Sequence, residues 1–245
     1  MMETTTAQPN EPRGDRRPFF EHLEEMRQRL FRSLLWLSAA TVICGWFAPQ
    51  ILAWLIRPVG RVYFQSPVEP FFTHLNAAFL GGITLSFPLL AWEVWGFLRP
   101  ALKPKERSWV LEIVLASAAL FFLGAAIGWT VLLPTALKIL LSFGTEFMEP
   151  MLSIGHYVNF AFWLLIGCGI AFQIPLVVLF LSATGLVQPR SLWIQWRLAT
   201  VGLLVLAAAL TPGPDIMSQL ILAAPLFTLY FGSAALSLFW ARELK

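Results

Sequence analysis

Charged side chains are scarce in this sequence. Only 13% of its 245 residues are Asp, Glu, Lys or Arg, whereas a soluble domain carries about 25%. The two cysteines and three histidines lack the spacing of a disulfide framework or a metal site. No HExxH helix, G-x-S-x-G turn or phosphate-binding P-loop occurs. These absences count against a metalloprotease, a serine hydrolase and a nucleotide hydrolase. The sequence therefore predicts no enzyme, no cofactor and no metal.

Apolar residues make up 58% of the chain, and its mean hydropathy is +0.70. About 20 apolar residues cross a bilayer as a helix. The sequence predicts an all-α integral membrane protein with six spans, at about 33–47, 73–98, 109–133, 157–186, 198–210 and 216–241. Pro49 and Pro134 are expected to end the first and third spans, and Pro175 is expected to kink the fourth. The fifth span, at roughly 21 Å, is shorter than the ~30 Å hydrocarbon core, so the bilayer is expected to thin beside it.

The basic residues predict the orientation, because Lys and Arg near span ends mark the cytoplasmic side. Most lie in the N-terminal segment, the second and fourth loops and the C-terminal tail: Arg13, Arg16, Arg17, Arg27, Arg29, Arg32, Arg99, Lys103, Lys105, Arg107, Arg190, Arg197, Arg242 and Lys245. The opposite side holds only Arg57, Arg61 and Lys138. Both termini are therefore expected in the cytoplasm. This placement explains the basic pI without a nucleic-acid partner.

Arg16-Arg17 precedes an apolar run, an outline shared with export signals of the twin-arginine pathway. A secretory signal has an apolar region of about 7–15 residues and a small-residue cleavage site. Here charged residues separate the pair from a run that is the first of six spans. The pair is interpreted as a basic anchor, and the chain as something other than cargo.

Residues 22–34 are predicted to form an amphipathic helix along the cytoplasmic surface that turns into the first span. Its apolar face consists of Leu23, Met26, Leu30 and Leu34. Glu25 stands four residues before Arg29, an order that favours an ion pair of roughly 0.3–0.5 kcal/mol. On local sequence alone, this solvated pair explains Glu25 better than a binding role does.

Glu106 and Asp215 precede apolar spans, where carboxylates cap helices. Capping is the better local explanation of both. Glu93 is the acidic residue clearly inside a span, about 9 Å below the cytoplasmic end. A buried carboxylate is a functional candidate, and the alternative is a pair with Arg99 or Lys103. Gln173 lies near the middle of the fourth span, where packing within the chain and docking of a partner helix are equally open.

Five segments together resemble the TatC family, the signal-receptor subunit of twin-arginine protein translocases. They are HLEEMRQRL, PFF at 70–72, WEVWGFLRPALKPKER, FQIP and TPGPDIMSQ. The resemblance extends from about His22 to Trp240. It implies a single membrane domain over residues 22–240, with cytoplasmic tails at 1–21 and 241–245. It also implies a concave, glove-like bundle with short fifth and sixth helices, located in the inner membrane of a prokaryote.

The resemblance implies a receptor for the Arg-Arg signal peptides of folded export substrates. It would assemble as a multimer and recruit TatA-like and TatB-like single-span subunits. Glu25 and Glu106 would receive the arginines, with Arg27 and Phe97 on the same surface. A carboxylate can accept two hydrogen bonds from the planar guanidinium of arginine, and a lysine ammonium cannot form the same contact.

The resemblance also marks residues away from this surface. Gln173 and Pro175 would form an intramembrane polar or partner-helix site, and Asp215 and Phe71 would belong to the outer loops. Several relatives carry glutamate at the position of Gln173, and the position of Glu93 is often glutamine. A charge at Gln173 is therefore not required, and Glu93 is either an extra acceptor for the signal or a bystander.

Three alternatives come from other classes: a secondary transporter or channel, an intramembrane enzyme, and a scaffold without a ligand. The sequence shows no clear internal repeat and one embedded acid close to a surface, which is unlike the midplane sites of transporters. Solute uptake, substrate turnover and signal binding would discriminate among the three.

Overall fold

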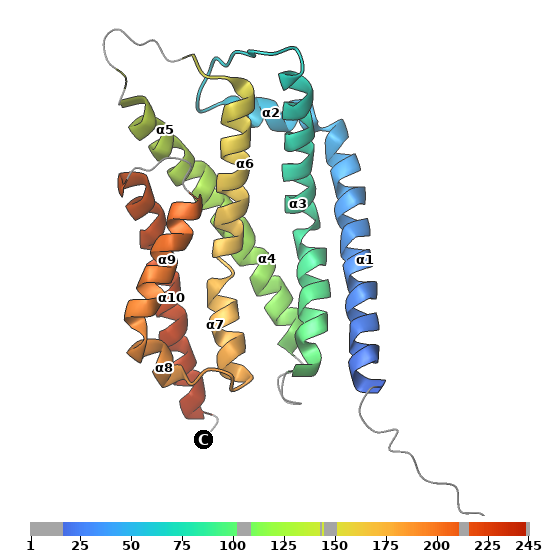
Figure 1. Cartoon of the computed structure of the whole chain (residues 1–245), viewed down its shortest axis with the longest axis vertical. Coiled ribbons are helices and arrows are strands. Elements are labelled where there is room, and N and C mark those ends of the chain that lie inside the picture. Colours follow the sequence, from blue (N-terminus) through green and yellow to red (C-terminus); the bar gives the residue numbers. More distant parts are fainter. Residues whose placement is uncertain (1–16, 102–108, 143, 145–150, 211–215, 244–245) are drawn as a thin grey trace, which may run out of the picture.

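The computed structural model describes residues 17–101, 109–142, 144, 151–210 and 216–243. Long helices run up and down through the molecule (Figure 1). Among the described residues, three helices are long and apolar enough to cross a membrane, and a bent pair makes a fourth when it is counted as one span. Trp196–Ala209 and Leu222–Ser237 are shorter apolar stretches. The count of six spans stays a prediction.

Helix α1 (Arg17–Trp46) is one continuous helix of 30 residues. The prediction of a surface helix that turns into the first span is therefore wrong. Neither glycine nor proline occurs between Phe19 and Cys44, so nothing in the sequence breaks the helix. The chain bends by 74° only after Trp46, where helix α2 (Ala48–Ile56) begins with Pro49 in its first turn. The predicted end of the first span is thus confirmed.

Helix α3 (Glu69–Leu98) is followed by a short 3₁₀ turn, η1 (Arg99–Ala101), as expected from Arg99-Pro100. The third apolar run forms α4 (Val110–Ile127), a π-helical stretch η3 (Gly128–Leu132) and α5 (Leu133–Ser142). The prediction that Pro134 ends this span is wrong. The wider π turn interrupts the regular hydrogen-bond ladder just before the proline, so the helix continues past it.

The fourth run is broken as Pro175 predicted, into α6 (Ile154–Ala171) and α7 (Ile174–Ala183). Helix α8 (Pro189–Ile194) precedes α9 (Trp196–Leu210), which is short as expected. Helix α10 (Ile216–Glu243) has 28 residues, so the expectation of a short sixth helix is wrong. Pro225 lies inside α10 without ending it.

Helix α6 lies at the centre of the bundle. Val158, Ala161 and Cys168 on α6 are fully buried. The core around them includes Leu55 of α2, Ala77 of α3, Phe121 of α4, Ala207 of α9 and Leu226 of α10. The Phe121 ring stacks on Phe87 of α3, with 3.7 Å between ring centroids. It also fills the space that a side chain on Gly169 would need.

Large apolar side chains cover the outside of the molecule. Leu30 is 68% exposed, Trp46 85% and Leu198 73%. Such an apolar surface is stable against lipid and not against water. Helix α1 begins and α10 ends at the same end of the bundle, the lower end in Figure 1.

Candidate signal-binding site

A cluster of three charged side chains lies where the start of α1 meets the end of α3, at the lower end of the bundle in Figure 1. Arg29 donates from Nε and Nη2 to Glu25 Oε1, at 3.0 and 2.8 Å. The Nη1 atom of the same guanidinium lies 3.4 Å from Glu93 Oε2 and 3.5 Å from the Glu93 carbonyl oxygen. The local pair predicted for Glu25 and Arg29 is confirmed, and it extends to a second helix.

Glu93 is the most enclosed member of this cluster. Its side chain is 9% exposed, against 25% for Arg29 and 38% for Glu25. Burial of a carboxylate without a partner costs several kcal/mol, and Glu93 has an ion pair with Arg29. Within the described residues, Glu93 thus pairs with Arg29 of α1 and not with Arg99, one of the two partners named in the alternative; the other, Lys103, lies outside the described residues.

Gly96 makes room for the guanidinium. A Cβ atom at this position would lie 2.3 Å from Arg29 Nη1 and 3.1 Å from its Cζ. Any residue other than glycine would therefore displace Arg29 from the end of α3. Gly96 stands three residues after Glu93, on the same face of the helix.

The amphipathic pattern predicted for residues 22–34 is present in α1, and its two faces differ in exposure. Leu23, Met26, Leu30 and Leu34 are exposed, while Glu25 and Arg29 are partly covered by α3. In a membrane protein the outward face meets lipid, so apolar residues point outward and polar pairs can be enclosed. The apolar face of the amphipathic pattern is thus the outward side of α1, and its charged face turns toward α3.

The other predicted recognition residues are placed as follows. Arg27 is exposed and pairs with Glu24 at 2.6 Å, on a different side of α1 from the cluster. Phe97 is half-buried near the end of α3. Glu106 lies outside the described residues. The structure thus brings Glu25 and Glu93 together through Arg29.

Gln173 lies at the break between α6 and α7, two residues before Pro175. Its Oε1 accepts a hydrogen bond from Ser117 Oγ at 2.6 Å, and its Nε2 donates to the Ser117 carbonyl oxygen at 3.0 Å. Both ends of the amide are therefore bonded to α4. This contact favours packing within the chain, one of the two roles left open by the sequence.

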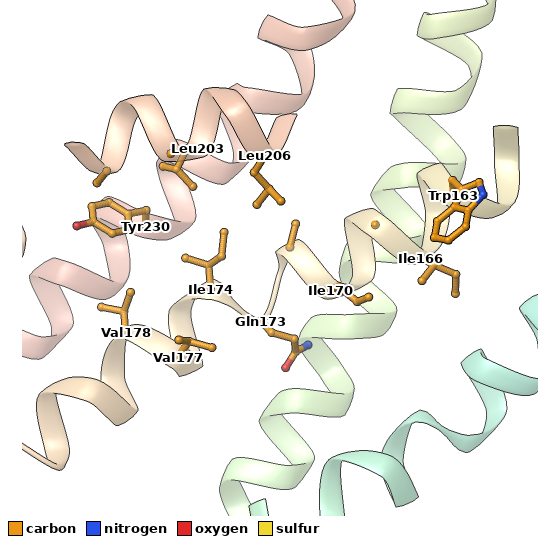
Figure 2. Close-up of a pocket in the computed structure, with 14 residues that line it drawn as sticks. Trp163, Ile166, Ile170, Gln173, Ile174, Val177, Val178, Leu203, Leu206 and Tyr230 are labelled. Atoms are coloured by element: carbon orange, nitrogen blue, oxygen red, sulfur yellow. The ribbon is translucent and has the colours of Figure 1, made fainter. Parts of the chain in front are cut away.

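A groove of about 530 Å³ lies between α6 and α7 on one side and α9 and α10 on the other. Its walls are apolar, with Ile174 and Val178 on one side and Leu203 and Tyr230 on the other. Figure 2 shows Gln173 at its edge, pointing toward α4 rather than across the groove. Pro175 follows in the same broken segment.

At the opposite end of the bundle, the start of α3 is clamped to the start of α6. The Glu69 carboxylate accepts hydrogen bonds from Ser153 Oγ, from Gly155 N at 2.7 Å and from Gln65 N at 2.6 Å. Tyr63 adds two backbone hydrogen bonds to the same segment, with Leu152 and Ile154. Together these bonds fix the loop between α2 and α3.

The two residues expected in outer loops are placed differently. Phe71 lies in the first turn of α3, not in a loop, because the helix already begins at Glu69, with Pro70 in its first turn. Its ring is exposed and meets Phe72 edge-on, with 5.6 Å between centroids. Asp215 lies outside the described residues.

Sequence reasoning missed the central position of Arg29, the space left by Gly96, and the partner of Gln173. From the sequence alone, Arg29 is only a neighbour of Glu25 on the same helix. A glycine one turn after an embedded acid was the signal available for Gly96. Ser117, a hydroxyl inside an apolar span, was the corresponding signal for Gln173.

These features define an all-helical membrane protein with an enclosed charge cluster at one end of the bundle. The profile of the family described as "Sec-independent protein translocase protein (TatC)" matches residues 21–225. The chain belongs to the TatC family.

Relatives and a solved structure agree with this assignment. The chain is 35% identical over 230 residues to the TatC protein of Carboxydothermus hydrogenoformans. This match covers 92% of this chain and 93% of the relative. It is 36% identical to that of Synechocystis sp., over 87% of this chain and 85% of the relative. A crystal structure described as "Twin Arginine Translocase Receptor- TatC" superposes with a TM-score of 0.79, at 30% identity, over 89% of this chain and 98% of that one. These relatives are named as translocase proteins and not as enzymes.

Proposed function

We propose that this protein is the core receptor of a twin-arginine translocase. It binds the Arg-Arg signal peptides of folded export substrates at the cytoplasmic end of the bundle. Family membership and the charge cluster support this function over the channel, enzyme and scaffold alternatives. The protein would lie in the inner membrane of a prokaryote, with both termini in the cytoplasm.

The observation that carries the proposal is the way Glu25 is bound. Its Oε1 atom already accepts two hydrogen bonds from one guanidinium, that of Arg29. Such a forked contact is specific to arginine, because a lysine ammonium is a point donor. The Glu25 carboxylate is therefore suited to bind a guanidinium, and a twin-arginine signal peptide carries two of these groups.

Glu106 is proposed as the second carboxylate on the family's pattern. In sequence it precedes Val110 by four residues. Val110 packs in a small cluster with Ala91 and Trp95 at the same end of α3 as Glu93. Arg27 and Phe97, at the neighbouring ends of α1 and α3, would complete the surface. Charged hydrogen bonds of about 1.5–3 kcal/mol each would explain a requirement for two arginines.

TatA-like and TatB-like single-span subunits are proposed as the partners that complete a multimeric translocation site. The groove beside Gln173 and Pro175 offers apolar walls for a partner helix within the membrane. Since the Gln173 amide is bonded to Ser117, a partner would contact those walls rather than a free amide.

Export measured in cells that lack their own TatC protein tests the function. Glu106→Ala and Glu25→Ala are expected to abolish export of a reporter with a twin-arginine signal while the protein still accumulates in the membrane. Arg32→Ala changes an exposed residue on the same helix as Glu25 and should retain export. Disappearance of the Glu106→Ala protein itself would favour the capping role, and full export by both variants would contradict the proposal.

A further inference from the structure

We propose that Arg29 is the resident counter-ion of the signal site. When a signal arginine binds Glu25, Arg29 gives up Glu25 and passes to Glu93. Signal binding is then an exchange of one guanidinium for another, and Glu93 acts by receiving the one that is displaced. This inference rests on the proposed function of Glu25.

The distances show Arg29 shared unequally between two acceptors. Its contacts with Glu25 are 2.8 and 3.0 Å, within the normal range for a charged hydrogen bond. Its contacts with Glu93 are 3.4 and 3.5 Å, longer than that range. The bonds to Glu93 can therefore shorten and strengthen once Glu25 is taken by another cation.

The charges of the cluster favour the same step. Two carboxylates, Glu25 and Glu93, share one guanidinium, so the three described side chains carry a net charge of −1. One incoming guanidinium makes the group neutral. Each carboxylate would then be paired with a guanidinium of its own, and an enclosed charge needs such a pair.

Exposure decides which carboxylate meets the ligand. Glu25 is 38% exposed and open to the surface, whereas Glu93 is 9% exposed beneath Arg29. A peptide can reach Glu25 directly. Glu93 is therefore a positioning residue that acts through Arg29, and Gly96 supplies the space in which the guanidinium moves.

The exchange also explains selectivity. A ligand must replace a two-point contact on Glu25. A second guanidinium can form the same fork, but an ammonium cannot. Arg29 thus excludes lysine by occupying the site until an equivalent group arrives.

The test is equilibrium binding of a labelled twin-arginine signal peptide to the purified full chain. Glu93→Gln removes the alternative acceptor, so Arg29 stays on Glu25 and affinity is expected to fall about tenfold, or ~1.4 kcal/mol. Adding Arg29→Gln removes the competitor. The double variant Arg29→Gln/Glu93→Gln is expected to regain at least wild-type affinity and to bind a twin-lysine peptide better than the wild type does.

A charge-matched control separates exchange from a general field effect. Glu93→Gln/Arg32→Gln has the same net charge as the first double variant, but it leaves Arg29 on Glu25. Exchange predicts no rescue in this control, while a field effect predicts equal rescue. Neither double variant leaves Glu93 as a lone buried charge, and thermal unfolding checks that both fold.

The results that overturn the inference are specific. A first double variant as weak as Glu93→Gln alone means that Glu93 contacts the peptide itself. Wild-type affinity of Glu93→Gln means that Arg29 does not need Glu93, and rescue by the Arg32 control means that only net charge matters. Equal binding of twin-arginine and twin-lysine peptides by the wild type would instead refute the receptor function, and this inference with it.

Discussion

Gly96 determines where the Arg29 guanidinium can lie, because an added Cβ would come within 2.3 Å of Nη1. The atom that must move is the end of a long side chain, so the fold can tolerate the change. Gly96→Ala is therefore expected to leave thermal stability nearly unchanged and to weaken signal-peptide binding severalfold, by keeping Arg29 away from Glu93. Gly232→Ala is the control, since nothing lies within 4 Å of a Cβ there. Unchanged peptide affinity of Gly96→Ala would contradict this role.

Gln173 and Ser117 are predicted to stabilise the protein as a pair. Gln173→Leu removes both hydrogen bonds between the α6–α7 break and α4, whereas Ser117→Ala removes only the one that Ser117 Oγ donates to Gln173 Oε1. The double-mutant cycle is expected to give a coupling of about 0.6–1.7 kcal/mol, as measured for other pairs between membrane helices. Unfolding in detergent supplies the four free energies. Strict additivity would mean that the hydrogen bond between the two side chains contributes nothing.

The close approach of α1 to α3 depends on a second glycine. A Cβ on Gly82 would lie 2.8 Å from Thr41 Cα and 2.9 Å from its backbone nitrogen. Backbone cannot rotate away as the Arg29 side chain can, so the two helices must separate. Gly82→Ala is expected to cost about 1–3 kcal/mol of stability. Thermal unfolding beside Gly232→Ala checks this, and equal midpoints for the two variants would be the contrary result.

At the level of helices, most boundaries were predictable because they depend on local signals. Pro49, Arg99-Pro100 and Pro175 mark breaks that the structure shows. The helix end predicted at Pro134 is wrong because the effect of this proline depends on the π turn before it. No single residue in the sequence indicates that turn. Glu25–Arg29 was predictable from a spacing of four, whereas the contact of Arg29 with Glu93 joins residues 64 apart and depends on how α1 packs against α3.

The orientation of the whole molecule can be tested with cysteine labels. Arg61 lies in the loop before α3, and Gln188 lies between α7 and α8, at opposite ends of the bundle; both are exposed. An impermeant thiol reagent applied to intact spheroplasts should label Arg61→Cys and spare Gln188→Cys. Cys44 and Cys168 are buried and should give little background. The reverse pattern would place both termini outside.

The central claim is that this TatC-family protein receives signal peptides through carboxylates that bind arginine. The most direct measurement is equilibrium binding of twin-arginine and twin-lysine signal peptides to the purified chain, with Glu106→Gln and Glu25→Gln beside it. The account predicts a loss of about tenfold or more for the twin-lysine peptide and for each variant, equal to ~1.4 kcal/mol. Equal affinity in all combinations would mean capture by the apolar surface alone and would contradict the account.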